Sequence, residues 1–148
     1  MTSVADDIQP GQLVGSNLTL QQGLWGGLIV LGNAPISVSG GATAQIEGIP
    51  ASDTNGLYGG SDASDNSGTY NYISVRHGGT SIGEGNEING VTFGGVGTGT
   101  TVSNIEVVAN VDDGIEFFGG TVNASNLLVW AQGDDGLDID QSLSLIHI

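Results

Sequence analysis

Two acidic runs of this chain have nearly the same sequence. The run DDGIE at residues 112–116 returns, 22 positions later, as DDGLD at residues 134–138. If the copies lie side by side, like charges about 5 Å apart repel one another, which raises some of the carboxylate pKa values. A bound Ca²⁺ removes this repulsion, because it takes about six to eight oxygen ligands from carboxylates and turn carbonyls. The sequence therefore predicts one or more calcium ions, with the candidate ligands Asp112, Asp113, Asp134 and Asp135.

Two other interpretations of these residues stay open. The sequence DDG favours a tight bend, so the runs could be solvated acidic turns without a ligand. A carboxylate pair on either side of a glycosidic bond can instead act as acid and base, which makes the same four aspartates candidate catalytic groups. Such enzymes also use basic residues, and the candidates here, Arg76 and His77, lie in an earlier segment of the chain. We expect Arg76 to form a salt bridge and His77 to be a hydrogen-bonded turn residue.

The acidic runs belong to a longer repeat that predicts the fold. Residues 102–118 read VSNIEVVANVDDGIEFF and residues 124–140 read ASNLLVWAQGDDGLDID, with seven of 17 aligned positions identical. A repeat this short, rich in β-formers and glycine, is too small for a pair of helices and matches one coil of a β-solenoid. Apolar alternation over strand lengths, with no helical period, indicates an all-β chain.

The alternation also assigns faces to the strands of the two repeated coils. Residues that should point inward are Ile105, Val107, Ala109, Ile115 and Phe117, and then Leu127, Val129, Ala131, Leu137 and Ile139. Asn104 should lie over Asn126 and form an amide ladder. Trp130 should point outward, where it either packs under a loop or offers its indole to a sugar ring.

Composition limits the partners that the chain can have. Sixteen acidic residues and one basic residue give a net charge of −15, which disfavours nucleic acid and anionic membrane surfaces as partners. There is no Cys, so disulfides and thiolate metal sites are excluded. No apolar run is long enough to span a membrane. The first residues resemble no secretory signal, so we expect any export signal to lie outside this sequence.

We expect residues 1–142 to form one β-helix fragment, with a long polar loop near residues 51–69. The last six residues, LSLIHI (143–148), resemble the translation of a sequencing-library adapter. They interrupt the 22-residue rhythm, and we expect them to be a non-native tail in which His147 has no role.

Several long phrases of the sequence resemble a family of bacterial surface or secreted proteins that are often described as lipoproteins. The phrases are GLWGGLIVLGNAPIS (23–37), QIEGIPASDTNGLYGG (45–60), ISVRHGGTSIGEGNEINGVTFGGVG (73–97), DDGIEFFGGTVN (112–123) and GDDGLDIDQ (133–141). The resemblance covers nearly all of residues 1–141. It implies a right-handed parallel β-helix of the pectin-lyase-like kind and an extracellular or outer cell-surface location, and it supplies no catalytic residues.

GDDG at 133–136 is also similar to the GDD-type motif of polygalacturonase-like glycoside hydrolases, which share the β-helix. Those enzymes need a His and a basic pair in later coils, which this sequence does not contain. The sequence therefore favours a non-enzymatic structural or adhesin-like module, acidic and calcium-associated, with polysaccharide or cell-surface components as partners. The alternative is a carbohydrate-active enzyme, a hydrolase before a lyase, that uses the DDG carboxylates.

Overall fold

The computed structural model describes residues 1–9, 11, 18–83 and 86–143. Strands and turns make up almost all of this part of the chain, and its one helical element is a 3₁₀ turn, η1 (Thr54–Gly56). The strands are β1 (Leu28–Leu31), β2 (Ala44–Gln45), β3 (Leu57–Tyr58), β4 (Thr69–Arg76), β5 (Ser81–Gly83), β6 (Asn86–Glu87), β7 (Val91–Gly94), β8 (Thr101–Val108), β9 (Ile115–Phe118), β10 (Asn123–Trp130) and β11 (Leu137–Asp140). The predicted all-β class is confirmed.

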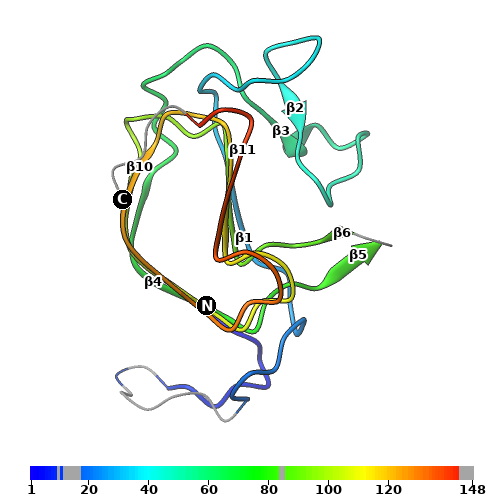
Figure 1. Cartoon of the computed structure of the whole chain (residues 1–148), viewed down its shortest axis with the longest axis vertical. Coiled ribbons are helices and arrows are strands. Elements are labelled where there is room, and N and C mark those ends of the chain that lie inside the picture. The colour runs from blue at the N-terminus through cyan, green and yellow to red at the C-terminus, as the bar shows by residue number, and fades with distance from the viewer. Residues whose placement is uncertain (10, 12–17, 84–85, 144–148) are drawn as a thin grey trace.

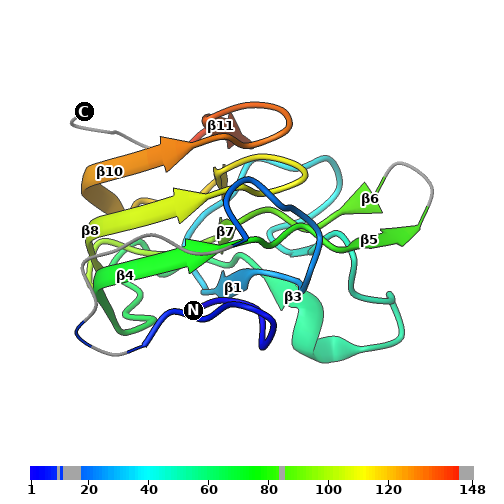
Figure 2. The same cartoon turned by 90° about the horizontal axis from the view of Figure 1, so that it is seen from below.

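Two parallel sheets face one another across the interior of the coils (Figure 1). One sheet has the strand order β1-β7-β9-β11, and the other has the order β10-β8-β4. From β7 onward the chain alternates between the sheets, so successive coils stack along one axis (Figure 2). Paired residues are 22 positions apart between β8 and β10 and between β9 and β11, but 32 apart between β4 and β8. This is the predicted parallel β-helix, with longer coils before the repeat.

Each strand of the β10-β8-β4 sheet bends at one residue in the left-handed region. The φ angle is 54° at Tyr72, 55° at Asn104 and 56° at Asn126, and the pairs on either side of these positions stay in register. Asn adopts this conformation more readily than most residues. The Nδ2 of Asn126 donates to Oδ1 of Asn104 at 3.2 Å, and Nδ2 of Asn104 donates to Oδ1 of Asn71 at 2.9 Å. The predicted amide ladder is therefore confirmed, and it extends one coil further.

The core lies between the two sheets and consists of stacked side chains. The residues predicted to point inward in the first repeated coil are all buried: Ile105, Val107, Ala109, Ile115 and Phe117. The rings of Phe93 and Phe117 stack with their centroids 5.4 Å apart. Leu137 and Ile139 hold the equivalent positions in β11 but are 40% and 44% exposed, because no described strand lies beyond β11.

Two short antiparallel hairpins, β2–β3 and β5–β6, project beside the β1-β7-β9-β11 sheet (Figure 1). The predicted loop at 51–69 contains η1 and β3, so its first half forms part of the β2–β3 hairpin. Its second half returns to the coil: the N–H of Gly59 donates to the carbonyl of Gly32 at 2.9 Å, and the N–H of Thr98 donates to the carbonyl of Ala63 at 3.0 Å. Only the first half of the segment leaves the solenoid.

Of the predicted tail at 143–148, only Leu143 lies among the described residues. Leu143 is partly buried and packs against the main apolar core. Residues 144–148 lie outside the described part of the chain, and the adapter origin of the segment stays a prediction.

Candidate functional site

The two acidic runs form the turns that lead into β9 and β11. These strands pair in register, with Glu116 opposite Asp138. A Cβ on Gly114 would lie 2.7 Å from the carbonyl oxygen of Gly136, so a larger residue there would push the two coils apart. The glycine of the DDG sequence thus permits close stacking, and close stacking brings the carboxylates of successive coils to the same edge.

A first group of carboxylates, which we call the outer group, consists of Asp112, Asp113 and Asp134. One oxygen from each lies within 4.8 Å of the others. These are three of the four predicted calcium ligands. The fourth, Asp135, meets the group through its backbone, because its N–H donates to Oδ1 of Asp113 at 2.8 Å. Its carboxylate is in neither acidic group that the described residues form.

A second group, the inner group, shares one member with the first. It consists of Asp113, Glu116 and Asp138, whose oxygens also lie within 4.8 Å of one another. Asp113 and Glu116 are buried, and Asp138 is half-buried. Asn89, which is 1% exposed, donates from Nδ2 to Glu116 and, at 3.1 Å, to Oε1 of Glu47.

Burial and mutual repulsion raise the pKa of these carboxyl groups. Burial raises the pKa of Glu116 to about 8, with the charges of Glu47, Asp113 and Asp138 acting in the same direction and the Asn89 hydrogen bond opposing them. Burial also raises the pKa of Asp113 to about 6, although the hydrogen bond from Asp135 opposes the shift. The site therefore holds carboxylates that lack a compensating positive charge and gain from a proton or a cation.

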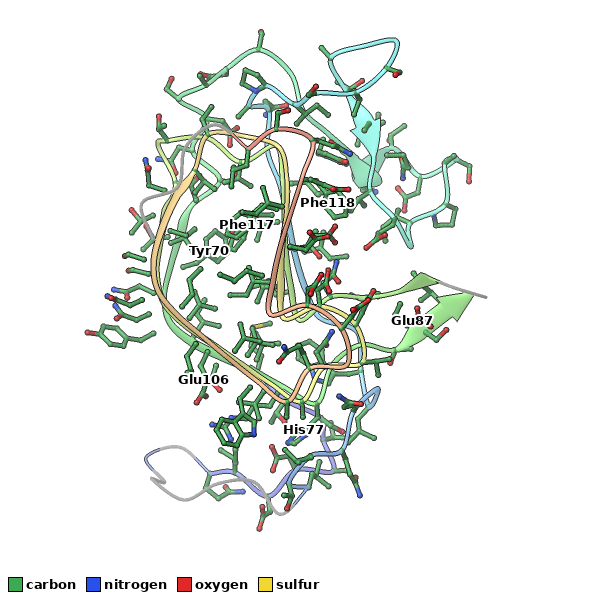
Figure 3. All side chains as sticks on the ribbon, viewed as in Figure 1. Tyr70, His77, Glu87, Glu106, Phe117 and Phe118 are labelled. Carbon is green, nitrogen blue, oxygen red and sulfur yellow. The ribbon has the colours of Figure 1, made fainter. Side chains whose placement is uncertain are left out.

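Glu116 and Asp138 alternate along β9 and β11 with the inward-pointing residues, so they lie on the outer face of the β1-β7-β9-β11 sheet. The two hairpins project from this side of the sheet (Figure 1). In Figure 3, Phe117 points into the space between the sheets, whereas Phe118 lies on the hairpin side and Glu87 belongs to the β5–β6 hairpin. The ring of Tyr58, from the β2–β3 hairpin, contacts Phe118 with the centroids 6.1 Å apart. The hairpin is thus anchored by its own small apolar cluster next to the acids.

The basic and aromatic residues singled out in the sequence lie elsewhere. Arg76 belongs to the other sheet, where its Nη2 is 2.7 Å from Oε2 of Glu106. His77 is fully buried, with Nδ1 2.7 Å from the carbonyl oxygen of Gln21. The expected roles of a salt bridge and a hydrogen-bonded turn histidine are therefore confirmed. Trp130 points outward and is 62% exposed, also on the β10-β8-β4 sheet, so it does not pack under a loop.

The architecture and the sequence agree on the family. Residues 9–144 match the family described as "Pectate-lyase like beta helix domain". The chain belongs to this family, as the resemblance implies. No curated protein and no solved structure gives a significant match. Among the residues that the structure describes, no helix is long and apolar enough to cross a membrane.

Sequence reasoning did not single out four residues of the acidic face as site residues: Glu47, Asn89, Glu116 and Asp138. The 22-residue repeat already aligned Glu116 with Asp138. Asn89 stands 24 residues before Asp113, and both precede a glycine of their coil. That alignment was a usable signal. Glu47 had none, because its position depends on where the β2–β3 hairpin docks.

Proposed function

We propose that the chain is a non-enzymatic structural module of an extracellular or cell-surface protein, and that its acidic face binds calcium. The observation that carries the calcium site is the outer group, in which oxygens of Asp112, Asp113 and Asp134 lie within 4.8 Å of one another. Two Ca–O bonds of about 2.4 Å span this limiting distance, so small movements of the side chains are enough to bring all three oxygens to one ion. No lysine or second arginine exists in the chain to neutralise them.

The proposed location and the adhesin-like role are supported by other features than the acidic groups. The resemblance to bacterial surface and secreted proteins supports export, and a net charge of −15 suits a medium that contains divalent cations. Three large side chains stand exposed on the β10-β8-β4 sheet: Tyr72 (82%), Leu128 (55%) and Trp130 (62%). Exposed aromatic rings of this kind can stack on sugars, which supports polysaccharide or cell-surface components as partners.

Titration calorimetry with CaCl₂ on the whole chain tests the calcium site. We expect saturable heat with a dissociation constant of about 0.1–1 mM, the range of extracellular calcium modules. The double variant Asp112→Asn/Asp134→Asn should lose the part of this heat that comes from binding to the outer group. Asp62→Asn, a change of one charge in the segment after β3, should retain it. Absence of heat from the unmodified chain at millimolar calcium contradicts the proposal.

A carbohydrate-active enzyme is the second candidate, and one observation favours it. Glu116, with its pKa raised to about 8, holds a proton near neutral pH and adjoins the carboxylates of Asp113 and Asp138. A protonated and an ionised carboxyl group side by side are the groups that glycoside hydrolysis uses. However, Arg76 and Trp130 both lie on the other sheet, and the aromatic rings beside the acids, Tyr58 and Phe118, pack against one another in the hairpin cluster.

The two candidates separate in an activity assay. Release of reducing ends or unsaturated products from polygalacturonate by the unmodified chain, abolished in Glu116→Gln, supports the enzyme. We expect no release, with or without calcium. Binding of the same polysaccharide that weakens in Trp130→Ala, but not in Glu116→Gln, supports the adhesin-like role.

A further inference from the structure

The oxygens of the acidic face form two overlapping groups of three, not one group of five. Asp112 and Asp134 belong only to the outer group, and Glu116 and Asp138 belong only to the inner group. With Ca–O bonds of about 2.4 Å, a single ion does not reach all five carboxylates as they stand, because their oxygens do not all lie within 4.8 Å of one another. One ion in the outer group therefore leaves Glu116 and Asp138 crowded and without a counter-charge.

We propose that Asp113, Glu116 and Asp138 form a second divalent-cation site, and that Asp113 bridges it to the outer site. This inference rests on the proposed function of the outer group. Charge supports it, since five carboxylates carry up to five negative charges and two divalent cations neutralise four of them. Geometry supports it too, because the inner oxygens, like the outer ones, all lie within 4.8 Å of one another.

A buried amide gives independent support for a ligand in the inner group. Asn89 is 1% exposed, and its Nδ2 donates to Glu116 and Glu47, so the head of its side chain points into the acids. Its Oδ1 is buried and has no hydrogen-bond partner in the described part of the chain. A buried carbonyl oxygen without a partner is costly. Because Nδ2 faces the acids in this structure, a half-turn of the amide would present Oδ1 to the inner group as a neutral fourth ligand, and bonds to the ion would replace the hydrogen bonds to Glu116 and Glu47.

The two sites should differ in burial, and the charge of the face also changes from coil to coil. In the stacked coils, Asn89, Asp113 and Asp135 hold the same position before a glycine. An amide at the first of these positions lowers the negative charge at the buried end of the face, while aspartates remain at the exposed end. Asp134 of the outer group is exposed, whereas Glu116 of the inner group is buried, so we expect the inner site to be the more enclosed of the two and to exchange its ion more slowly.

Equilibrium dialysis of the whole chain against Ca²⁺ counts the bound ions and tests the inference. We expect two ions per unmodified chain. Glu116→Gln and Asp138→Asn should each retain one, Asp112→Asn/Asp134→Asn should retain the other, and Asp113→Asn should weaken both. Glu106→Gln, the same substitution on the other sheet, should retain two. Gln at position 116 can still accept the hydrogen bond from Asn89, and far-UV circular dichroism checks that each variant is folded.

The outcomes distinguish the inference from the function on which it rests. One ion in the unmodified chain, unchanged in Glu116→Gln, overturns the second site and leaves the proposed function intact. No bound ion at saturating calcium overturns both. Two ions that both persist in Glu116→Gln and in Asp138→Asn also overturn the inner site, because they place the second ion elsewhere.

Discussion

Glu106 and Glu116 show how the same stacking of coils gives the two sheets outer faces with different charges. Both lie on the outer face of a parallel sheet, in β8 and β9, ten residues apart in the chain. Burial works to raise the pKa of Glu106, but hydrogen bonds from Ser74 and Arg76 and the charge of Arg76 lower it below its usual value. Burial and neighbouring carboxylates raise the pKa of Glu116 to about 8. The difference lies in the neighbours that stacking supplies.

In-register stacking places each residue over its counterpart one coil away, whatever the charges are. On one sheet it brings Arg76 and Ser74 within reach of Glu106. On the other sheet it brings Asp138 beside Glu116. A cluster that the fold assembles without a counter-charge is a natural place for a cation. Variants in the core that both sheets share, and variants on each outer face, test this comparison.

The largest effect should follow from removing the core that holds the two faces together. Phe117 is 2% exposed and stacks on Phe93. Phe117→Ala should lower the free energy of unfolding by about 3–5 kcal/mol, because it leaves a cavity between the sheets. Denaturant unfolding measures the loss. Phe118→Leu, at the neighbouring position on the outer face, should cost less, and equal losses would contradict the placement of the core.

Neutralising a carboxylate of the acidic face should give the next largest change in the free energy of unfolding, and this change should be an increase. Glu116 has a higher pKa folded than unfolded, so the folded chain holds a proton that the unfolded chain releases as the pH rises above about 4.5. Stability should therefore fall between about pH 4.5 and pH 8 in calcium-free buffer. Glu116→Gln should remove part of this fall and stabilise the chain at pH 8 by on the order of a few kcal/mol.

Thermal unfolding in EDTA across this pH range measures the effect. Glu106→Gln is the matched control, and it should not stabilise the chain at any pH. Identical pH profiles for Glu116→Gln and the unmodified chain would contradict the electrostatic difference between the two faces.

The amide ladder should contribute an intermediate amount on the β10-β8-β4 sheet. Asn104→Ala removes hydrogen bonds to Asn71 and Asn126 and places Ala at a φ of 55°. We expect a loss of about 1–2 kcal/mol by denaturant unfolding. Asn104→Gly removes the same hydrogen bonds without the backbone strain, so it should cost less. If the glycine variant is the less stable one, the left-handed bend is not the reason for Asn at this position.

The smallest effect should follow from breaking the ion pair between Arg76 and Glu106 on the β10-β8-β4 sheet. Arg76 and Glu106 are 22% and 30% exposed, so solvent screens their interaction. Arg76→Gln should lower the free energy of unfolding by less than about 1 kcal/mol. Calcium binding should not change, because the pair lies on the other sheet. A loss of calcium binding in this variant would mean that the two faces are coupled.

The repetitive part of the fold could be predicted because its rules are local. The 22-residue repeat fixed the pairing of β8 with β10 and of β9 with β11, and alternation identified Ile115 and Phe117 as core residues. The β2–β3 and β5–β6 hairpins could not be predicted in this way, since each strand has only two or three residues and no alternation.

The candidate site could also be predicted only where its residues belong to the repeat. Asp112, Asp113 and Asp134 come together because they occupy aligned turns, whereas the carboxylate of Asp135 does not join either group. Adjacent aspartates in a turn look alike in sequence, and only the backbone conformation decides which side chain joins the cluster. Glu47 reaches Asn89 through a contact 42 residues distant in the chain, which no repeat encodes.

The most direct test of the calcium-binding acidic face is a crystal structure of the whole chain grown with calcium, with an anomalous difference map at long wavelength. We predict one peak among the oxygens of Asp112, Asp113 and Asp134, about 2.3–2.6 Å from each. A second peak among Asp113, Glu116 and Asp138 would also confirm the inner site. An acidic face without anomalous density at saturating calcium would contradict the account.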